Sequence, residues 1–425
     1  MRICFISRRY FPAISGMSVY AENLLRQLVA FGHDVTMISQ YRGDPAGVAV
    51  YGGGPPPEVS GVRVIGLEAI GEQKVGEGGP ADFERDLHEI VSVAIAEHAT
   101  KRFDIVHAQY GYPTGLAALE ISRRTGIPNV VSIQGGDGHW VGGCCTAHRE
   151  AMRAVLLHSN QILIGSQSFA AEVKENHDVP ESVFQVVPGA TDIDRFQPTS
   201  HDHAADVARL GAPVFLYHGR IDLRKGLGEL IDAMKEIAGR RPHSRLIISG
   251  IGPDVDEFQR RIDAERLGHC VEMTGYCHYA DAPSVYRRGD VFVSPTYSEG
   301  FSNTILEAMA SGLAVISTDT VGVRDCIEHE RNGLLVPTRD AKSLAAAMIR
   351  LFDDAPLRKR LAEEGFREVH SQYCWPVVAR QIEACYERVR GREPDNRWTE
   401  RCDPSRWELQ HADLTCRFRT APHLL

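Results

Sequence analysis

The chain has 425 residues, which is too long for one ordinary core and suits two or three domains. Its composition, 43% hydrophobic and 24% charged residues, is typical of a folded, soluble globular protein. The formal net charge of −9 excludes a nucleic-acid binder that depends on an overall positive field, although it leaves room for a local basic pocket.

The sequence contains no signal peptide or membrane span that we can identify. Arginines interrupt the apolar run of MRICFISRRYFP at once, and no later run reaches the roughly 18 apolar residues that a span requires. The ten cysteines are scattered along the chain. We therefore expect a cytoplasmic protein with free thiols, and peripheral contact with the inner face of the membrane stays open.

Two local groups of cysteine and histidine raise the question of a metal site. Neither group has the paired ligand spacing of common zinc sites, so the sequence predicts no bound metal. The groups are Cys144, Cys145 and His148, and Cys270, Cys277 and His278.

Short apolar runs alternate with longer amphipathic segments along most of the chain. The apolar runs are nearly continuous, as expected for strands that helices cover on both faces. The predicted strands are 2–7, 34–39, 62–67, 103–109, 129–134, 161–166, 184–189, 214–219, 245–250, 271–275, 290–295, 313–318 and 333–337. The predicted helices are 18–32, 81–99, 148–159, 226–239, 253–268, 303–312, 341–354 and 375–391.

This alternation predicts an α/β fold with two Rossmann-like domains, each built on a parallel sheet. A polar stretch at 197–213 interrupts the alternation, so we place the first domain at 1–196 and the second at 197–375. Residues 376–391 form a helix that we expect to cross back to the first domain, and the tail at 392–425 has no assigned role. Two such domains predict a central cleft at the carboxyl ends of the strands, where open sheets bind ligands.

The segment HGRIDLRKG, residues 218–226, carries three cations between a predicted strand and a predicted helix. A helix N-terminus offers N–H groups and a positive dipole to an anion. Arg220, Arg224 and Lys225 add guanidinium and ammonium groups, which makes a diphosphate clamp plausible. A solvated basic turn explains the local sequence equally well.

The segment EGFSNTILE, residues 299–307, places two glutamates between a strand and a helix. Thr304 and Glu307 fit the Thr-x-x-Glu capping box, which gives Glu307 a structural explanation. Glu299 lies in the loop beside Gly300, where a carboxylate can accept hydrogen bonds from sugar or ribose hydroxyls.

Three further segments of the first half place polar residues or glycines after strands. Gly16, in FPAISGMSVY, allows close backbone approach to an anion at a helix start. In QGGDGHW, Gln134, Asp137 and His139 are candidates to line the predicted cleft. His107 ends the strand DIVHAQ, where a lone histidine is more often structural.

Together these motifs resemble glycosyltransferase family 4, whose members have the GT-B fold. SPTYSEGFSNTILEAMASGLAVIST (294–318) carries the family's Glu-x7-Glu pattern, and HGRIDLRKG supplies its Arg and Lys. Weaker agreement comes from FPAISGMSVYAENLLRQLVAFGHDV, FDIVHAQ, VPGATDIDRF and VGVRDCIEHERNGLLVP. The resemblance covers roughly residues 1 to 390, with the motifs in the expected order.

The resemblance implies retaining transfer of a sugar from a nucleotide-sugar donor to an acceptor hydroxyl, in glycan, glycolipid or glycosylated-metabolite biosynthesis. The second domain would bind the donor and the first the acceptor, with no cofactor and no divalent metal. It implies that Arg220 and Lys225 bind the diphosphate and that Glu299 lies beside the donor sugar. Further implied donor contacts are Glu307 at the ribose, Gly16, Gln134, and the backbone of Phe301, Ser302 and Asn303. Candidate acceptor or sugar contacts are His107, Asp137 and His139.

Three positions depart from the family pattern. Gln134 replaces a histidine that commonly contacts the donor sugar, and glutamine does not titrate. Gly16-Met17 replaces a glycine pair, and Pro188-Gly189-Ala190 replaces Pro-Asn-Gly. A nucleotide-sugar epimerase and a non-catalytic nucleotide-sugar-binding protein on the same fold therefore remain alternatives. The acceptor, a carbohydrate, lipid-linked glycan or small metabolite, is not specified by the sequence.

Overall fold

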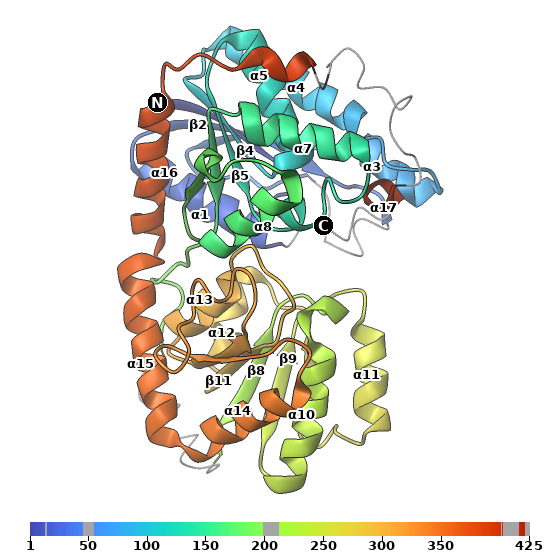
Figure 1. Cartoon of the computed structure of the whole chain (residues 1–425), viewed down its shortest axis with the longest axis vertical. Helices are drawn as coiled ribbons and strands as arrows, with labels where there is room; N and C mark the ends of the chain where they lie inside the picture. Colours follow the sequence, from blue (N-terminus) through green and yellow to red (C-terminus); the bar gives the residue numbers. More distant parts are fainter. Residues whose placement is uncertain (13–14, 46–54, 199–211, 401, 403–415, 421–425) are drawn as a thin grey trace. The chain divides into compact units, whose positions relative to one another are not determined.

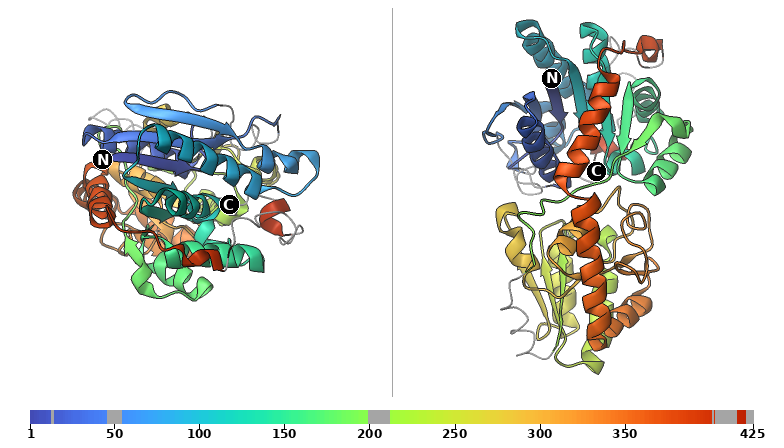
Figure 2. Two further views of the ribbon diagram at one scale, coloured as in Figure 1. Left: turned by 90° about the horizontal axis from the view of Figure 1, so that it is seen from above. Right: turned by 90° about the vertical axis from the view of Figure 1, so that its left-hand side faces the viewer.

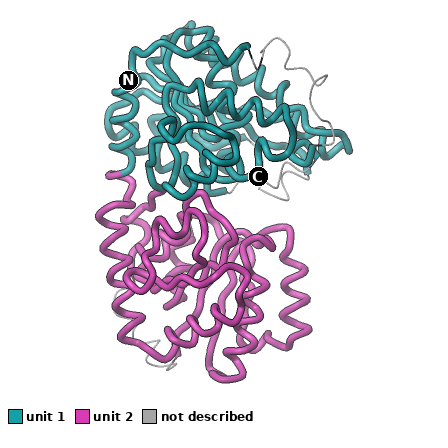
Figure 3. Tube along the Cα trace, in the orientation of Figure 1, with its two compact units in different colours: residues 1–188, 378–425 teal, residues 189–377 magenta. Residues whose placement is uncertain are grey.

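The computed structural model describes residues 1–12, 15–45, 55–198, 212–400, 402 and 416–420. The chain divides into two compact units, which Figures 1 and 3 show: Met1–Pro188 with Val378–Leu425, and Gly189–Val377. The chain thus passes from unit 1 to unit 2 at 188/189, before the domain boundary that we placed at 196/197. Phe196 explains the difference, because its ring is fully buried in the core of unit 2, 5.5 Å from the ring of Tyr286.

Unit 1 is built on a seven-stranded sheet in the order β3-β2-β1-β4-β5-β6-β7. All neighbouring strands pair in parallel, as the apolar runs predicted. The strands are β1 (Arg2–Ser7), β2 (Asp34–Tyr41), β3 (Val62–Glu68), β4 (Ile105–Gln109), β5 (Asn129–Ile133), β6 (Gln161–Ile164) and β7 (Phe184–Val186).

Helices cover the sheet of unit 1, and the sequence predicted the three longest that precede residue 188. They are α1 (Gly16–Ala30), α3 (Ile70–Gln73), α4 (Phe83–Thr100), α5 (Leu116–Thr125), α6 (Gly136–His139), α7 (Thr146–His158) and α8 (Gln167–His177). Short turns of other helical types are η1 (Lys74–Glu77), η2 (Gly111–Gly115) and η3 (Glu181–Val183).

Unit 2 repeats the arrangement with a six-stranded parallel sheet in the order β10-β9-β8-β11-β12-β13. In chain order this is the 3-2-1-4-5-6 arrangement of the Rossmann fold, so the predicted α/β architecture is confirmed. The strands are β8 (Val214–His218), β9 (Arg245–Ser249), β10 (Val271–Gly275), β11 (Val291–Ser294), β12 (Ala314–Thr318) and β13 (Leu334–Val336).

The helices of unit 2 lie on both faces of its sheet (Figure 2). Successive residues of β8 enter opposite cores: Phe215 and Tyr217 pack with α10 and α14, and Leu216 packs with α12 and α13. This explains why the strands are apolar at consecutive positions. The helices are α10 (Leu227–Arg240), α11 (Val255–Ala264), α12 (Ala282–Tyr286), α13 (Asn303–Ala310), α14 (Ala341–Asp353) and α15 (Ala355–Gln372), with η4 (Leu223–Lys225) and η5 (Tyr279–Asp281).

Helix α16 (Trp375–Val389) carries the chain from unit 2 into unit 1. Its hydrogen bonds within unit 1 join Tyr386 to His107, and Glu383 to His33 at 2.9 Å. Beyond it lie η6 (Asn396–Glu400), where Trp398 is fully buried, and α17 (Arg417–Thr420).

Most of the linker that we predicted at 197–213 falls outside the described residues. Among those that are described, no helix has the length and apolar composition needed to cross a bilayer.

A close backbone contact joins the loops that follow β8 and β11. Gly226 has a φ of +71°, and a Cβ at this position would lie 2.0 Å from the carbonyl oxygen of Pro295. The amide N–H of Tyr297 donates to the carbonyl oxygen of Arg224 at 3.0 Å. Only glycine satisfies both the backbone conformation and the approach, so Gly226 fixes how near the two loops come.

We predict that Gly226→Ala lowers the free energy of unfolding by about 2–4 kcal/mol, because it combines a strained φ with overpacking. Gly239→Ala is the matched control, since Gly239 lies in α10 and its added Cβ would meet no described atom within 4 Å. The control should stabilise the protein by about 0.5–1 kcal/mol, as alanine does in helices. Urea unfolding curves of the two variants measure both effects, and equal stabilities would contradict the proposed constraint.

Candidate functional site

The loop after β8 orders its basic side chains around one buried carboxylate. Asp222 is 4% exposed and accepts hydrogen bonds from the backbone N–H of Arg224 at 2.9 Å and from its guanidinium Nη2 at 2.8 Å. The Nε of Arg220 lies 3.6 Å from the same carboxylate. Burial by itself raises the pKa of Asp222, but the hydrogen bonds and charges of the two arginines hold it at about 2. Asp222 therefore stays ionised and orients both guanidinium groups.

The structure brings Lys225 and Glu299 together across 74 residues of sequence. The Nζ of Lys225 lies 2.6 Å from Oε1 of Glu299, and the two side chains are 27% and 20% exposed. The backbone of Glu299 is held from the other side, because its N–H donates to the carbonyl of Val321 at 3.1 Å. A Cβ on Gly322 would meet the carbonyl oxygen of Glu299 at 2.2 Å, so this contact also requires glycine. A partly exposed ion pair thus lies at the carboxyl ends of β8 and β11.

Glu307 does not cap a helix, which corrects the capping-box interpretation. Helix α13 begins at Asn303 after the N-cap Ser302, so Thr304 lies inside the first turn and no side-chain cap forms. Glu307 instead lies one turn further on, 6% exposed, and its Oε2 accepts a hydrogen bond from the Tyr286 hydroxyl at 2.7 Å. Burial raises the pKa of the Glu307 carboxyl to about 7.

The start of α13 packs closely against the segment that opens unit 2. A Cβ on Gly189 would lie 2.4 Å from Oδ1 of Asn303 and 2.7 Å from Cδ1 of Phe301. This contact accounts for the glycine in Pro188-Gly189-Ala190. Oδ1 of Asn303 is buried and has no hydrogen-bond partner among the described residues. The N–H groups of a first helical turn have no acceptor within the helix, so they are suited to an anion.

In unit 1, Gln134 belongs to the same hydrogen-bond network as the start of α1. Gln109 donates from Nε2 to Oε1 of Gln134 at 2.8 Å and to the carbonyl of Met17 at 2.9 Å. Met17 follows Gly16, which is the first residue of α1 after the N-cap Ser15. A Cβ on Gly16 would meet no described atom within 4 Å, so packing within the described structure does not require this glycine.

His107 and Asp137, two of the candidate substrate contacts, are buried and have hydrogen-bond partners within unit 1. His107 is fully buried, with Nδ1 on the Tyr386 hydroxyl and Nε2 2.7 Å from Oγ of Ser132. Burial lowers its pKa to about 3, so the ring is neutral. Asp137 is also fully buried and accepts backbone N–H bonds from Gly111, Gln134 and Gly135 at 2.8, 3.1 and 2.9 Å.

His139 is nearly as enclosed as these two residues. Its side chain is 6% exposed, and Nδ1 lies 2.6 Å from Oε1 of Glu172. Its ring centroid is 4.6 Å from that of Phe169. In the described structure His139 therefore packs inside unit 1, with little surface left for an acceptor.

Sequence reasoning missed one cluster of charge in unit 1. Arg8 and Arg9 follow β1 directly and bind Glu72 at 3.1 and 2.6 Å, and Arg42 lies 3.6 Å from the same carboxylate. Burial alone raises the pKa of Glu72, but the three guanidinium groups hold it at about 2. The Arg-Arg pair at a strand end was the available signal, whereas nothing in the sequence pointed to Glu72.

Tyr286 was also missed, although it determines the environment of Glu307. It lies on α12, and its ring is 5.3 Å from that of His218 at the end of β8. Phenol and carboxyl groups 21 residues apart meet only in the folded unit, so local spacing did not reveal the pair.

Comparison with known proteins assigns both halves of the chain. Residues 15–190 match the family model of the glycosyl transferase 4-like domain, and residues 200–368 match that of glycosyl transferases group 1. Glycogen synthase of Mycobacterium tuberculosis is 26% identical over 392 residues, which covers 89% of this chain and 92% of that protein. The D-inositol 3-phosphate glycosyltransferase of Corynebacterium diphtheriae is 25% identical, with 91% and 94% covered.

Solved structures show the same fold. Sucrose-phosphate synthase from Thermosynechococcus elongatus superposes with a TM-score of 0.76 at 23% identity, covering 91% of this chain and 98% of that one. Anabaena HepE in complex with UDP-glucose gives a TM-score of 0.70 at 17% identity, covering 91% and 100%. The chain therefore belongs to glycosyltransferase family 4, and it is a retaining glycosyltransferase of GT-B fold that transfers a sugar from a nucleotide-sugar donor.

Proposed function

We propose that the donor is a UDP-hexose and that unit 2 binds it through Arg220, Lys225, Glu299 and the start of α13. The observation that carries this proposal is the ion pair of Lys225 with Glu299, 2.6 Å long and partly exposed. The choice of UDP is supported by the solved complexes of Anabaena HepE with UDP and with UDP-glucose. The acceptor is a hydroxyl group of a glycan, a glycolipid or a small metabolite.

The ion pair suggests how a donor would enter the site. A diphosphate would compete with Glu299 for the Lys225 ammonium, and Arg220 would share the added negative charge. Glu299, released from Lys225, would then accept hydrogen bonds from hydroxyls of the donor sugar. Departure of the nucleoside diphosphate develops negative charge, which preorganised cations stabilise in the transition state.

Glu307 and unit 1 supply the remaining proposed contacts. The Glu307 carboxylate, oriented by the Tyr286 hydroxyl, would accept from the ribose hydroxyls. In unit 1, the N-terminus of α1 at Gly16 and the side chain of Gln134 would contact the donor. Because Gln134 replaces a titratable histidine with an amide that both donates and accepts, we expect it to affect which sugar is preferred rather than nucleotide affinity.

The purified protein should release nucleoside diphosphate from a UDP-hexose and form a glycoside when an acceptor is supplied. The panel should contain UDP-glucose, other UDP-hexoses and donors with different bases, each with carbohydrate, lipid-linked and metabolite acceptors. A new nucleotide-sugar formed without acceptor would indicate an epimerase instead. Donor binding in calorimetry without turnover on any acceptor would indicate a non-catalytic binding protein.

We predict that Lys225→Ala lowers kcat/KM by about 10²–10³, as expected when one preorganised group that stabilises developing charge is lost. Lys235→Ala is the matched control, because Lys235 lies in the same unit, is 58% exposed and pairs with Glu265. The control should retain full activity, since exposed ion pairs contribute little. Steady-state rates of UDP release measure both variants, and unchanged kcat/KM in Lys225→Ala would refute its assignment.

We predict that the stability difference between the wild type and Glu307→Gln depends on pH. The folded pKa of Glu307, about 7, lies above its ordinary value of 4.5, so the folded protein keeps a proton that the unfolded chain releases. Wild-type stability should therefore fall as pH rises from about 4.5 to 7, by up to roughly 3 kcal/mol from this group. Glu307→Gln does not lose stability in this way, so its free energy of unfolding should rise relative to that of the wild type between pH 5 and pH 8.

Urea unfolding of both proteins at several pH values measures this difference. Glu265→Gln serves as a control, because Glu265 is partly exposed and its ion pair with Lys235 lowers rather than raises its pKa. Parallel stability profiles for the wild type and Glu307→Gln would show that folding does not raise the pKa of Glu307.

A further inference from the structure

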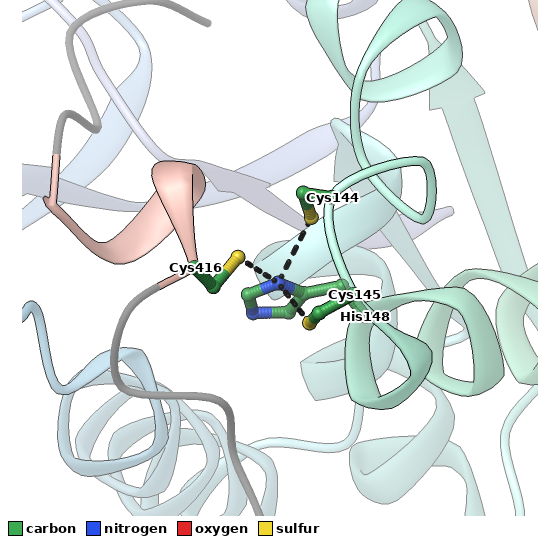
Figure 4. Close-up of side chains that lie close together, drawn as sticks. All are labelled: Cys144, Cys145, His148 and Cys416. Atoms are coloured by element: carbon green, nitrogen blue, oxygen red, sulfur yellow. Dashed lines mark hydrogen bonds between the residues drawn. The ribbon is translucent and has the colours of Figure 1, made fainter.

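Four side chains with metal-binding atoms converge in unit 1, and none of them is a candidate donor or acceptor contact. Cys144 and Cys145 precede helix α7, His148 lies in its first turn, and Cys416 immediately precedes α17 (Figure 4). Their three sulfur atoms and one imidazole nitrogen all lie within 4.8 Å of one another. Among the described residues, this is the one group of three or more such side chains close enough to hold an ion.

The three sulfur atoms surround a single nitrogen. Nδ1 of His148 lies 3.2 Å from Sγ of Cys144, 3.3 Å from Sγ of Cys145 and 3.5 Å from Sγ of Cys416. One ring nitrogen offers either one proton or one lone pair, so this nitrogen alone cannot form full hydrogen bonds with all three thiols at once. A tetrahedral zinc ion with bonds of about 2.3 Å to sulfur and 2.0 Å to nitrogen would set that nitrogen about 3.5 Å from each sulfur. The observed nitrogen-to-sulfur separations, 3.2 to 3.5 Å, lie close to this value.

The position of Cys145 favours its metal-binding form. Cys145 is the N-cap of α7, where the helix dipole stabilises a thiolate.

Around the cluster, the C-terminal segment, residues 416–420, contacts both α4 and α7. The Phe418 ring stacks on Phe83 of α4 at 4.6 Å and meets the edge of His148 at 4.9 Å. Arg419 binds Glu84 through Nη1 at 2.8 Å, and its carbonyl accepts from the N–H of Ala81 at 2.9 Å. A zinc ion with three thiolates has a net charge of −1, which the neighbouring Arg419 guanidinium helps to offset.

We propose that Cys144, Cys145, His148 and Cys416 bind one Zn²⁺ ion, which fastens the C-terminal segment to unit 1. Four protein ligands leave no open coordination position, so the ion has a structural role. Binding releases three thiol protons and changes no oxidation state. Sequence spacing did not reveal the site because the fourth ligand, Cys416, lies 268 residues beyond His148.

The first test is the metal content of the full-length protein and of single-cysteine variants. Protein expressed with zinc and dialysed against a weak chelator should retain about one zinc ion per chain. Cys416→Ser and Cys145→Ser should lower this content at least about tenfold. Cys277→Ser is the control, because Cys277 is partly buried in unit 2 and its thiol bonds only to the carbonyl of His278 among the described residues. It should leave the zinc content unchanged.

Spectroscopy and thiol counting separate zinc from the competing explanations. Cobalt substitution should give tetrahedral d–d bands and thiolate-to-cobalt charge transfer, and zinc X-ray absorption should show three sulfur ligands and one nitrogen. All ten cysteines should react as thiols after denaturation with a chelator. A metal-free wild type, stoichiometric iron in place of zinc, or a disulfide that lowers the thiol count by two would each overturn the proposal.

A structural role also predicts a local change when the metal is removed. A strong chelator should speed hydrogen exchange and tryptic cleavage at Arg417 and Arg419, and the same change should appear in Cys416→Ser without chelator. Exchange in β1 and β4 of unit 1 and in β8 of unit 2 should stay the same, which shows that the rest of the chain remains folded. Equal protection of residues 416–420 with and without zinc would refute the proposed anchor. These outcomes do not depend on the donor or the acceptor.

Discussion

The parallel pairing of β8 with β11 is the constraint on which the proposed donor site depends. Val291 pairs with Phe215 and Phe292 with Leu216, so the two strands end at the same edge of the sheet. The loops that leave this edge carry Lys225 and Glu299, which explains how residues 74 positions apart form a 2.6 Å ion pair. Because each strand is followed by a helix, the same edge also collects helix N-termini, which favour anions.

Backbone packing and buried carboxylates then make these loops rigid before a ligand arrives. Glycine at 226 and 322 lets neighbouring loops approach to distances that any Cβ would prevent. Asp222, held ionised by its arginines, fixes their guanidinium groups. A site that is ordered in this way loses less conformational freedom when a charged donor binds, which is how preorganisation increases both affinity and transition-state stabilisation.

Much of this architecture could be predicted from the sequence because central strands such as β1, β4 and β5 are buried on both faces. Such strands appear as short continuous apolar runs, and every run that we interpreted as a strand is one. Helix α15 was not predicted, because its apolar pattern is weak. Its buried residues are Leu357, Leu361, Gly365 and Val369, a single narrow stripe in which one position is glycine, so its apolar periodicity is weak.

The details of the candidate sites were less predictable because they depend on distant residues or on the exact start of a helix. The N-cap of α13 is Ser302, two residues before Thr304, so the predicted capping box does not form and Glu307 bonds to Tyr286 instead. His107 lies within β4 and Asp137 follows β5, and both are buried against hydrogen-bond partners that no local pattern encodes. The lysine and glutamate of the ion pair were predictable only because both belong to motifs that resemble a known family.

The C-terminal segment is too short to be stable alone, so it needs contacts with the rest of unit 1 or a bound ligand. Helix α17 has four residues, too few for a helix that is stable alone, and ordering such a segment costs conformational entropy. Phe418 and Arg419 give it one stacked ring and one ion pair, both on α4. Cys416 adds contacts to a different helix, α7, and a metal there would hold the segment at two places instead of one. All four ligands belong to unit 1, whereas Lys225 and Glu299 belong to unit 2. Because four protein ligands leave no open coordination position, the proposed ion would stabilise unit 1 without taking part in the transfer reaction.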